Sequence, residues 1–490
     1  MELLSVLPEA DVHPTLDPEI LRVRYDSRRV SPGDLFVALR GERQDGFDHV
    51  PEAVARGAAA VVSDRPAPEA IAGRLCWVRV GNPRRALGLL SAQLAGNPAE
   101  KLVLAAVTGT NGKTTTTMLL EALLGRRHGG AGFLGTIGYR TGRREAAASR
   151  TTPEAPEIQE LLAEMVREGV PAAAIEVSSH ALALERVAGC RFDVAVFTNL
   201  TRDHLDFHGD MESYYQAKKK LFAMRKPGAA AVVNLDDESG RRLGSEASPP
   251  VVTYSVSGRP EAAVRAVSAR CDLSGTALDV EHAGGRFHVA SPLLGRFNVE
   301  NLAAAAAAGL ALGMRAEQIA PALASVRRVP GRLEPVEAGQ AYPILVDYAH
   351  TEDALGRLLS AVRELTDKKI LLVFGCGGDR DRGKRFPMGR VAGRMADIAI
   401  ATSDNPRSED PLAILAEVER GLAASGATKF LKIPDRREAI GAAIGLANPG
   451  SVVVIAGKGH ETTQIVGEKE SPFDDRLVAA ELARAKPSGR

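Results

Sequence analysis

A glycine-rich stretch with one lysine and several threonines is the strongest chemical signal in the sequence: Gly109-Thr110-Asn111-Gly112-Lys113-Thr114-Thr115. An apolar run at 102–107 precedes it, and the apolar spacing of 116–124 predicts a helix after it. Strand, glycine loop and helix in this order form a phosphate cradle, because backbone N–H groups and the positive helix end point at the anion. Lys113 would reach the outer phosphates, and the Thr114 hydroxyl would hold Mg²⁺. The pattern favours a nucleotide such as ATP over an ordinary glycine turn.

Candidate metal ligands lie further along the same region. Glu176 and His204 each lie near the end of an expected buried strand, at 172–177 and 193–198. A carboxylate inside such a strand is costly unless it is paired or binds a metal, so the two residues predict a second Mg²⁺ near the γ-phosphate. Lys218 follows on an expected helix at 213–222. If it is neutral, CO₂ can convert it to a carbamate, an oxygen ligand that suits a hard cation; the alternative is a solvated basic face at 218–220.

Three polar or glycine-rich loops follow strand candidates near the C-terminus, at 375–380, 402–407 and 456–461. In an open parallel sheet, ligands bind at the carboxyl ends of the strands. We therefore expect these loops to converge on one site, although each loop alone would be an ordinary turn.

Strand and helix candidates alternate along most of the chain, which predicts an α/β fold with mostly parallel sheets covered on both faces. The length of 490 residues agrees with about three domains. We place them at 1–98, 99–333, which holds the phosphate cradle, and 334–490.

Composition excludes several classes of protein. The 62 basic and 61 acidic residues give a net charge of +1, which offers no support for nucleic-acid binding or a membrane surface. The cysteines Cys76, Cys190, Cys271 and Cys376 are far apart, so we expect reduced, buried thiols rather than disulfides or a zinc site. No signal peptide and no membrane insertion are expected, and the predicted location is the cytoplasm.

A series of separated motifs resembles the Mur ligases in order and spacing over essentially the whole chain. These motifs are 109–115, Glu176-Val177-Ser178-Ser179-His180, residues 198–206, Ala217-Lys218, residues 298–301, Pro330-Gly331-Arg332 and Asp347-Tyr348-Ala349-His350. The family's fold has an N-terminal domain for the UDP moiety of the substrate, a central P-loop ATPase and a C-terminal Rossmann-like domain for the incoming amino acid. This arrangement agrees with the three expected domains.

The resemblance implies roles for individual residues. ATP would contact the cradle together with Asn301, Arg332, Asp347 and His350. The UDP-MurNAc-dipeptide would contact Ser27, Glu42, Arg43, Gln44, Thr151, Thr152, Ser178 and Arg186. Glu176, His204 and carbamylated Lys218 would hold one Mg²⁺ and Thr114 the other, with Lys113, Glu176, His204 and Lys218 as the catalytic set. Many relatives have glutamine where this chain has Leu184.

The loop Asp404-Asn405-Pro406-Arg407 resembles the form found in Mur ligases that add meso-diaminopimelate as the third residue of the peptidoglycan peptide. An arginine fork pairs a carboxylate with two parallel hydrogen bonds, and lysine lacks the distal carboxylate of diaminopimelate. Arg380, Gly457 and Glu461 would complete this subsite.

The resemblance implies that ATP converts the D-Glu side-chain carboxylate of UDP-MurNAc-L-Ala-D-Glu to an acyl phosphate, which diaminopimelate then attacks. We expect small-molecule partners only and a monomer. The alternatives are a lysine-adding or folylpolyglutamate-type ligase, a P-loop kinase or ATPase that forms no amide, and a nucleotide-gated binding protein.

Overall fold

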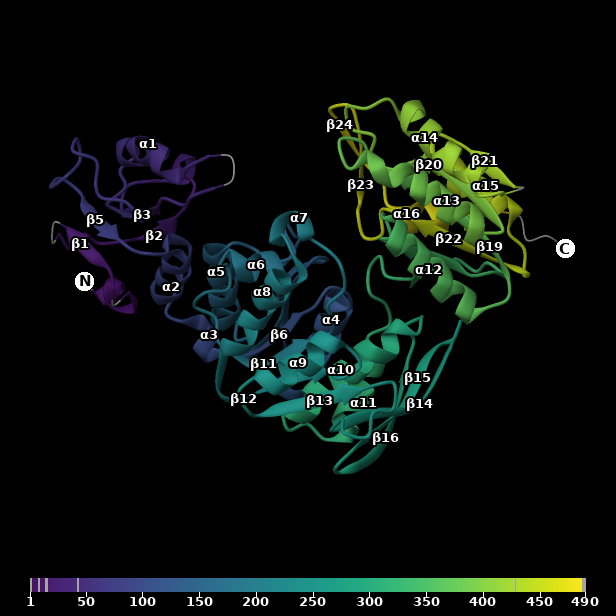
Figure 1. The fold of residues 1–490 in the computed structure, drawn as a ribbon, viewed down its shortest axis with the longest axis horizontal. Coiled ribbons are helices and arrows are strands. Elements are labelled where there is room, and N and C mark those ends of the chain that lie inside the picture. Colours follow the sequence, from purple (N-terminus) through teal and green to yellow (C-terminus); the bar gives the residue numbers. More distant parts are fainter. Residues whose placement is uncertain (1, 8, 14–15, 42–43, 428, 487–490) are drawn as a thin grey trace. The chain divides into compact units, whose positions relative to one another are not determined.

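The computed structural model describes residues 2–7, 9–13, 16–41, 44–427 and 429–486. The chain forms two compact units, which are described separately (Figure 1). The first comprises 1–265, 281–285 and 301–322, and the second comprises 266–280, 286–300 and 323–490. The boundaries at 98 and 333 therefore stay predictions.

The N-terminal part of the first unit is a sheet in the order β1-β5-β4-β3-β2, parallel except for the β1–β5 pair. Buried residues of β3 and β4 form its core, including Leu35, Val37 and Val62. Its elements are β1 (Asp11–His13), β2 (Arg22–Arg24), β3 (Asp34–Val37), α1 (Val50–Ala55), β4 (Ala60–Ser63), β5 (Cys76–Arg79), α2 (Pro83–Leu94) and α3 (Pro98–Lys101).

The strands of the central sheet that lie wholly in the first unit have the order β13-β12-β11-β6-β10-β7-β8-β9, in which the strands from β13 to β7 are parallel. Helix α4 packs on β6 and β10, and α8 packs on β6 and β12. The strands are β6 (Val103–Thr108), β7 (Gly132–Gly135), β8 (Gly138–Arg140), β9 (Glu145–Ala146), β10 (Ala172–Glu176), β11 (Phe192–Phe197), β12 (Arg225–Asn234) and β13 (Val251–Ser255). The helices are α4 (Lys113–His128), α5 (Ala155–Arg167), α6 (Ser179–Ala183), α7 (Leu205–His208), α8 (Met211–Ala223) and α9 (Glu238–Glu246).

Side-chain caps start several of these helices. Ser178 accepts a hydrogen bond from the Ala181 amide at the start of α6, and Asp210 accepts one from the Ser213 amide at the start of α8. A cap satisfies an amide that has no partner inside the helix and costs about 1 kcal/mol when lost. Ser178 thus marks the turn from β10 to α6, next to the predicted metal ligand Glu176, and Asp210 marks the turn from α7 to α8.

Three strands and two helices follow in the sequence. They are β14 (Val264–Asp272), β15 (Gly275–His282), β16 (Gly285–Ser291), α10 (Phe297–Ala311) and α11 (Ala316–Ser325). In α10, Ala303 to Ala308 have no exposed surface, whereas Ala311 is half-buried. This run of alanines is therefore packed inside the protein. Among the described residues, no helix is long and apolar enough to cross a membrane.

The C-terminal part of the second unit is a sheet in the order β17-β18-β22-β19-β20-β21, parallel except for β17. Leu372 and Phe374 of β19 face one core with α12, α13 and α14, whereas Leu371 and Val373 face the other with α15 and α16 (Figure 1). This alternation follows from the two-residue period of a strand. The strands are β17 (Glu334–Pro335), β18 (Ile344–Asp347), β19 (Lys369–Cys376), β20 (Ile398–Ser403), β21 (Phe430–Lys432) and β22 (Ser451–Ala456). The helices are α12 (Glu352–Leu365), α13 (Arg385–Met395), α14 (Pro411–Ala424), α15 (Arg436–Leu446) and α16 (Asp475–Ala485).

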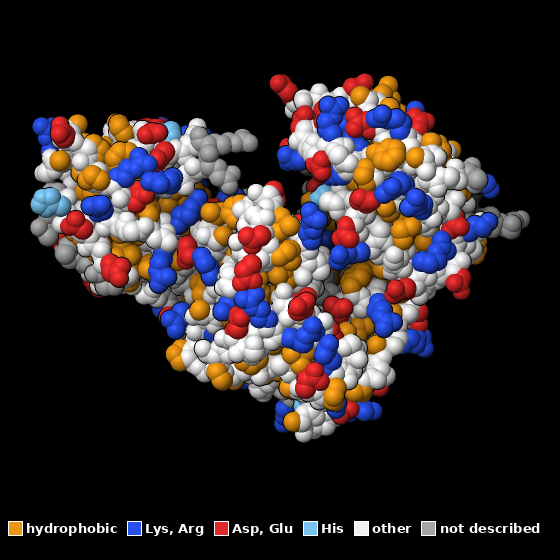
Figure 2. Space-filling view, in the orientation of Figure 1, with side chains coloured by type: hydrophobic (Ala, Val, Ile, Leu, Met, Phe, Trp, Pro, Cys, Tyr) orange, Lys and Arg blue, Asp and Glu red, His pale blue; other side chains and the backbone are white. Residues whose placement is uncertain are grey.

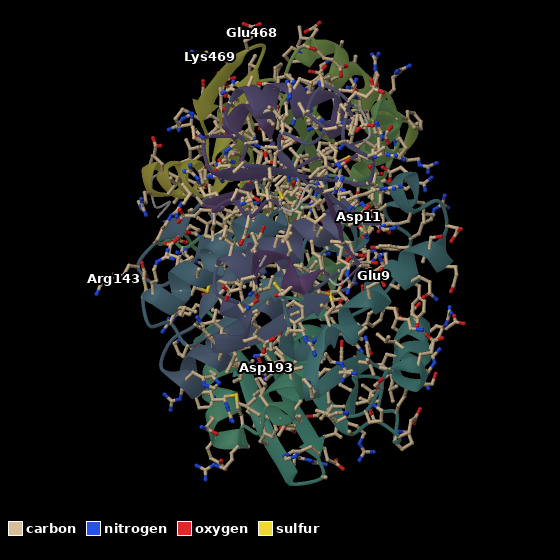
Figure 3. All side chains as sticks on the ribbon, turned by 90° about the vertical axis from the view of Figure 1, so that its left-hand side faces the viewer. Glu9, Asp11, Arg143, Asp193, Glu468 and Lys469 are labelled. Atoms are coloured by element: carbon tan, nitrogen blue, oxygen red, sulfur yellow. The ribbon has the colours of Figure 1, made fainter. Side chains whose placement is uncertain are left out.

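The hairpin of β23 (Thr463–Val466) and β24 (Lys469–Pro472) lies beside this sheet, and the exposed side chains of Glu468 and Lys469 mark its turn (Figure 3). The α/β fold class with mostly parallel sheets is confirmed. All four cysteines are free as expected, although Cys271 is only half-buried. Figure 2 shows basic and acidic side chains interspersed on the visible face.

Candidate active site

The phosphate cradle forms as predicted between β6 and α4. Gly112 has a φ of 83°, and a Cβ atom there would lie 2.3 Å from Oδ1 of Asn301, so glycine is required. The loop is tied to the end of β11 by hydrogen bonds from the Thr110 amide to the Asn199 carbonyl (2.8 Å) and from the Thr198 hydroxyl to the Asn111 carbonyl (2.6 Å). The structure thus brings Asn301 to the cradle, and its contact with ATP stays a prediction.

Two lysines converge on the carbonyl groups of this loop. Lys113 donates to the carbonyl oxygens of Thr110 (2.9 Å) and Gly109 (3.2 Å). Lys218, on α8, donates to the same Gly109 oxygen at 2.7 Å and is 1% exposed. Burial lowers the pKa of Lys218 well below its usual value, and the positive charge of Lys113 lowers it further. The solvated basic face considered from the sequence is therefore wrong for Lys218.

Glu176 lies at the end of β10 and faces the first turn of α4. The Thr114 hydroxyl is 3.1 Å from both of its carboxylate oxygens. The amide and the hydroxyl of Thr136 each donate to Oε2 at 3.0 Å. The buried carboxylate is thus held by hydroxyl and amide donors, and carboxylate and hydroxyl oxygens are the ligands that Mg²⁺ prefers.

His204 lies at the start of α7 with a φ of 52°, an unusual conformation for a residue with a side chain. Its ring lies 4.8 Å from that of His180, measured between centroids. Burial lowers the pKa of His204, so the imidazole is neutral near pH 7 and can act as a ligand. Among the described residues, no group of three or more His, Cys, Asp or Glu side chains is arranged to hold a metal.

The residues expected to hold the dipeptide gather at the end of β10. Thr152 donates to the Glu176 carbonyl at 2.8 Å and accepts from the Ser178 amide at 3.1 Å. The Thr151 hydroxyl lies 3.0 Å from that of Thr136. Arg186 forms an ion pair of 2.8 Å with Glu154 and also donates to the Thr152 carbonyl at 3.3 Å. The structure therefore joins this subsite to Glu176.

The predicted contacts with the UDP moiety are only partly described. The Ser27 hydroxyl donates to Glu52 at 2.7 Å, and the Gln44 carbonyl accepts from the Gly41 amide at 3.0 Å. Glu42 and Arg43 lie outside the described residues. Leu184 follows α6 as its C-terminal cap residue.

In the second unit, Asp347 ends β18 and accepts from the amides of Leu333 (2.8 Å) and Ala349 (2.9 Å). Burial raises the pKa of this carboxyl group. The Arg332 guanidinium lies over the Tyr348 ring, 5.4 Å from its centroid, and the imidazole of His350 contacts the Tyr348 carbonyl at 2.8 Å. These three predicted ATP contacts therefore form one cluster.

The three C-terminal loops do converge at the carboxyl ends of β19, β20 and β22. Arg407 donates to the Gly378 carbonyl at 2.7 Å, and Asn405 donates to Glu461 at 3.0 Å. A Cβ atom on Gly457 would lie 3.7 Å from Oδ2 of Asp404, and the Pro406 carbonyl borders Gly378. Arg380 follows Gly378 closely and is exposed.

One of these loops carries a fully buried lysine. Lys458 has no exposed surface, and its ammonium lies 3.0 Å from Oδ1 of Asn405, 3.4 Å from Glu461 and 3.5 Å from Asp404. A buried ammonium must be paired, so Lys458 fixes these acceptors and partly offsets two carboxylates.

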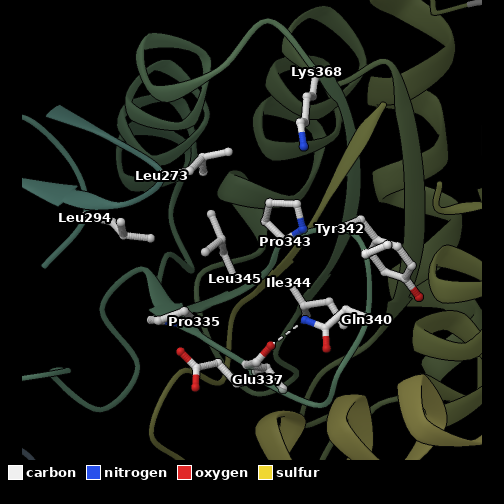
Figure 4. A pocket seen from close by; sticks show the side chains of 12 residues that line it. Leu273, Leu294, Pro335, Glu337, Gln340, Tyr342, Pro343, Ile344, Leu345 and Lys368 are labelled. Atoms are coloured by element: carbon white, nitrogen blue, oxygen red, sulfur yellow. Dashed lines mark hydrogen bonds between the residues drawn. The ribbon is translucent and has the colours of Figure 1, made fainter. Parts of the chain in front are cut away.

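A cavity of about 480 Å³ in the second unit lies elsewhere (Figure 4). It is lined mainly by apolar residues from the turn between β17 and β18, with Lys368 at its edge. None of the predicted site residues lines it. An apolar hollow suits neither a triphosphate nor a zwitterion, so the chemistry points to the loops instead.

Three family models match successive parts of the chain. They are the catalytic domain of the Mur ligase family at 19–94, the Mur ligase middle domain at 107–309, and the glutamate ligase domain of Mur ligases at 331–459. A UDP-N-acetylmuramoyl-L-alanyl-D-glutamate–2,6-diaminopimelate ligase from Geobacillus kaustophilus is 48% identical over 486 residues, which are 98% of each chain. The chain belongs to the Mur ligase family.

Two further Mur ligases support this assignment. A protein of the same name from Geobacter metallireducens is 44% identical and covers 99% of this chain and 98% of its own. A solved structure titled UDP-N-acetylmuramoyl-L-alanyl-D-glutamate–2,6-diaminopimelate ligase is 33% identical, with a TM-score of 0.71 and 99% of both chains covered. The family resemblance and the ligase class expected from the sequence are confirmed.

Several residues around this Mur ligase site were missed by sequence reasoning. Thr136 contacts Glu176, Lys458 contacts Asn405 of the C-terminal loops, and the Tyr214 hydroxyl lies 3.1 Å from that of Thr110. Lys458 stands between Gly457 and Glu461, so its place in a predicted loop was a usable signal. Thr136 and Tyr214 carried none, because only the fold brings them to the cradle.

Proposed function

We propose that this protein joins meso-diaminopimelate to the D-Glu side-chain carboxylate of UDP-MurNAc-L-Ala-D-Glu, with ATP as co-substrate, in peptidoglycan precursor synthesis. The observation that carries the proposal is the position of Arg407. Its guanidinium lies among the converged loops, with the Asn405–Glu461 pair nearby. A cationic group and an anionic group at one site suit the carboxylate and ammonium of an amino-acid side chain that bears both.

The first step is phosphoryl transfer. The D-Glu carboxylate attacks the γ-phosphorus of ATP, the bond to the bridging oxygen breaks, and an acyl phosphate and ADP result. The loop amides and Lys113 bind the phosphates and offset the negative charge that the transition state spreads over their oxygens. Thr152, Ser178 and Arg186 orient the dipeptide beside Glu176, because they already contact one another there.

The second step forms the amide. The amine of diaminopimelate attacks the acyl carbon, phosphate leaves, and the amine loses a proton. Arg407 and Arg380 would bind the distal carboxylate, while Asp404, Gly457 and Glu461 would surround the distal ammonium. Lys458 keeps Asn405 and Glu461 in place.

We expect Mg²⁺ at two positions, one at Thr114 and one at Glu176, His204 and carbamylated Lys218. Thr114 and Glu176 already place a hydroxyl and a carboxylate within 3.1 Å of each other. The amine of Lys218 does not suit a hard cation, but a carbamate on it would, and only the neutral amine reacts with CO₂. Burial makes that neutral form accessible. Bound Mg²⁺ would supply positive charge to the phosphate oxygens.

The alternative of a lysine-adding ligase differs only at the distal carboxylate. Lysine would leave Arg407 without an anionic partner, and an unpaired polar group in a recognition site strongly disfavours the analogue that lacks it. The kinase and the binding protein without chemistry have no use for the amino-acid loops.

An amino-acid panel tests the proposal. Phosphate release is measured with ATP, Mg²⁺ and the UDP-dipeptide, with diaminopimelate, lysine or no amino acid added. We expect release that depends on both the dipeptide and diaminopimelate. Equal turnover of lysine, or ATP hydrolysis that ignores both substrates, would contradict it. We further propose that the protein is cytoplasmic and monomeric. Sedimentation of the purified protein would test the monomeric state.

A further inference from the structure

A single carboxylate links the two loops that carry Arg380 and Arg407. Glu409 accepts a hydrogen bond from the amide of Asp379 at 2.7 Å. The same side chain is held from α13 by Arg385, whose Nη2 lies 2.8 Å and 2.9 Å from its two oxygens. Glu409 thus connects the backbone next to Arg380 with the segment that follows Arg407.

A second link runs in the opposite direction. Asp379 accepts from the Ser408 amide at 3.1 Å and from the Ser408 hydroxyl at 2.7 Å. Each loop therefore supplies a carboxylate to the other, one on either side of the arginines. We call this set of Asp379, Ser408, Glu409 and Arg385 the clasp.

The backbone at the clasp is strained where the arginines leave it. Asp379 has a φ of 52° and Arg407 has a φ of 53°. A residue with a side chain keeps such a conformation only when its surroundings over-determine it. The hydrogen bonds of Asp379 and Ser408 are the contacts that can do so.

Close packing leaves the loops little freedom. A Cβ atom on Gly378 would lie 1.9 Å from the Pro406 carbonyl oxygen, and the Gly378 amide donates to the Asn405 carbonyl at 2.9 Å. Nη1 of Arg407 in turn donates a hydrogen bond to the Gly378 carbonyl. Within the described parts of the chain, the structure gives no partner to its Nε and Nη2. The plane of the guanidinium is therefore oriented by the neighbouring loop, while donors remain for a ligand.

The buried end of the clasp explains why Glu409 cannot move aside. Arg385 has no exposed surface. A fully buried guanidinium must keep its anionic partners, and those are Glu409 and, at 3.4 Å, Glu417 of α14. Arg385 therefore anchors Glu409, and the pairing holds the pKa of this carboxyl group below its usual value.

We propose that Glu409 is a positioning residue for amino-acid specificity, which acts through Asp379 and the loop backbone to hold Arg380 and Arg407 as one receptor for a substrate carboxylate. This inference rests on the proposed function. It assigns Glu409 no contact with the substrate. Loss of the clasp should weaken binding of the distal carboxylate and leave ATP and the UDP-dipeptide unaffected, because neither binds at these loops.

The test compares Glu409→Gln with Glu417→Gln. Both substitutions remove one negative charge from Arg385, but the structure gives Glu417 no contact with 377–380 or 404–408. We expect Glu409→Gln to raise the KM for diaminopimelate about tenfold, with the other KM values and kcat within twofold. Glu417→Gln should leave all of them within twofold. Ser408→Ala, which removes a link without exposing a buried charge, should raise the same KM about threefold.

A combined variant separates positioning from mere structural support. If Glu409 acts only through Arg380 and Arg407, adding Glu409→Gln to the variant that carries both Arg380→Ala and Arg407→Ala should change the KM for diaminopimelate less than twofold. Multiplying effects, a similar rise in every KM, or identical behaviour of Glu417→Gln would overturn the inference. If Glu409→Gln does not fold, an unchanged KM for diaminopimelate in Ser408→Ala would overturn the inference.

The wild-type arm tests the proposed function separately. A wild-type enzyme that releases no phosphate in response to diaminopimelate contradicts that function. A diaminopimelate-dependent wild type whose KM is unchanged by Glu409→Gln contradicts only the role of Glu409.

Discussion

The ammonium nitrogen of Lys218 lies 2.7 Å from the carbonyl oxygen of Gly109, which joins helix α8 to the first residue of the phosphate cradle. Lys218 is almost fully buried, and the Tyr214 ring lies 4.5 Å from its nitrogen. A charged lysine is poorly accommodated there, and the direction of its pKa change agrees. This contact places a buried amine, whose pKa burial lowers, beside the phosphate cradle.

Lys218→Ala should lose activity about 100-fold or more, a size typical of removing one group that stabilises transition-state charge. Short carboxylic acids should restore part of the activity by occupying the space of the carbamate. Phosphate release with and without added acetate measures this. Lys219→Ala is the control, because Lys219 is only half-buried and pairs with Glu246 at 2.9 Å. Full activity of Lys218→Ala without acid would remove the carbamate from the mechanism.

Glu176→Gln should raise the Mg²⁺ concentration for half-maximal activity at least tenfold, since an amide is a weaker ligand than a carboxylate. Chelation with EDTA should abolish activity of the wild type, and added Mg²⁺ should restore it. Glu121→Gln serves as a control, because Glu121 lies on the same helix as Thr114 but pairs with Arg140. An unchanged Mg²⁺ requirement in Glu176→Gln would count against this residue as a ligand.

Arg407→Ala should raise the KM for diaminopimelate by about 10- to 100-fold, as expected for the loss of a charged hydrogen bond. The KM for ATP should change less than twofold. Initial rates at varied substrate concentrations separate the two effects. Arg437→Ala, at an exposed ion pair with Glu481, should change neither. Equal rises in both KM values would argue against a role in amino-acid binding.

Folding stability should fall as the pH decreases from 6.5 toward 4, in part through His460. Burial lowers the pKa of His460 to about 4, whereas the ordinary value is 6.5. Between these values the unfolded chain binds a proton that folded His460 does not, so acid favours unfolding. His460→Gln should lose about 1–2 kcal/mol less stability than the wild type between pH 7.5 and 5. Denaturant unfolding at both pH values measures this, and equal losses would contradict it.

The buried pair of Arg436 and Asp475 should contribute to the folding stability of the protein. Both side chains are fully buried, and two hydrogen bonds of 2.8 Å and 2.6 Å join them. Asp475→Ala should cost about 3–5 kcal/mol, because it leaves a guanidinium buried without its anion. Thermal unfolding provides the measurement. Glu481→Gln, at an exposed pair, should cost less than about 1 kcal/mol, and similar losses in both variants would contradict the prediction.

Much of the nucleotide site could be predicted from the sequence because its signals are local. The strand, the loop from Gly109 to Thr115 and the helix after it lie next to one another in the chain, and their hydrogen bonding follows from backbone geometry. Glu176 stood out because a carboxylate ends an otherwise apolar strand. The convergence of the C-terminal loops could likewise be predicted, because alternating strands and helices indicate a parallel sheet whose strands end at one edge.

Other parts could not be predicted, because they depend on long-range contacts. Thr136 reaches Glu176 only after β7 pairs with β10, and Tyr214 reaches Thr110 only after α8 packs on β6. The sequence also left Lys218 ambiguous, since three consecutive lysines suggest a solvated face. Its burial is a property of the packed helix.

The sequence by itself determined the α/β architecture, the phosphate cradle and the residue types that we expect to bind Mg²⁺. The reason is that hydrophobic periodicity and short motifs act over a few residues. Only the tertiary structure decided that Lys218 is buried against Gly109, that Lys458 stands behind Asn405 and Glu461, and that Glu409 connects the loops of Arg380 and Arg407. The physical reason is that burial and charge pairing are set by segments far apart in the chain, and these meet only when the sheets are assembled.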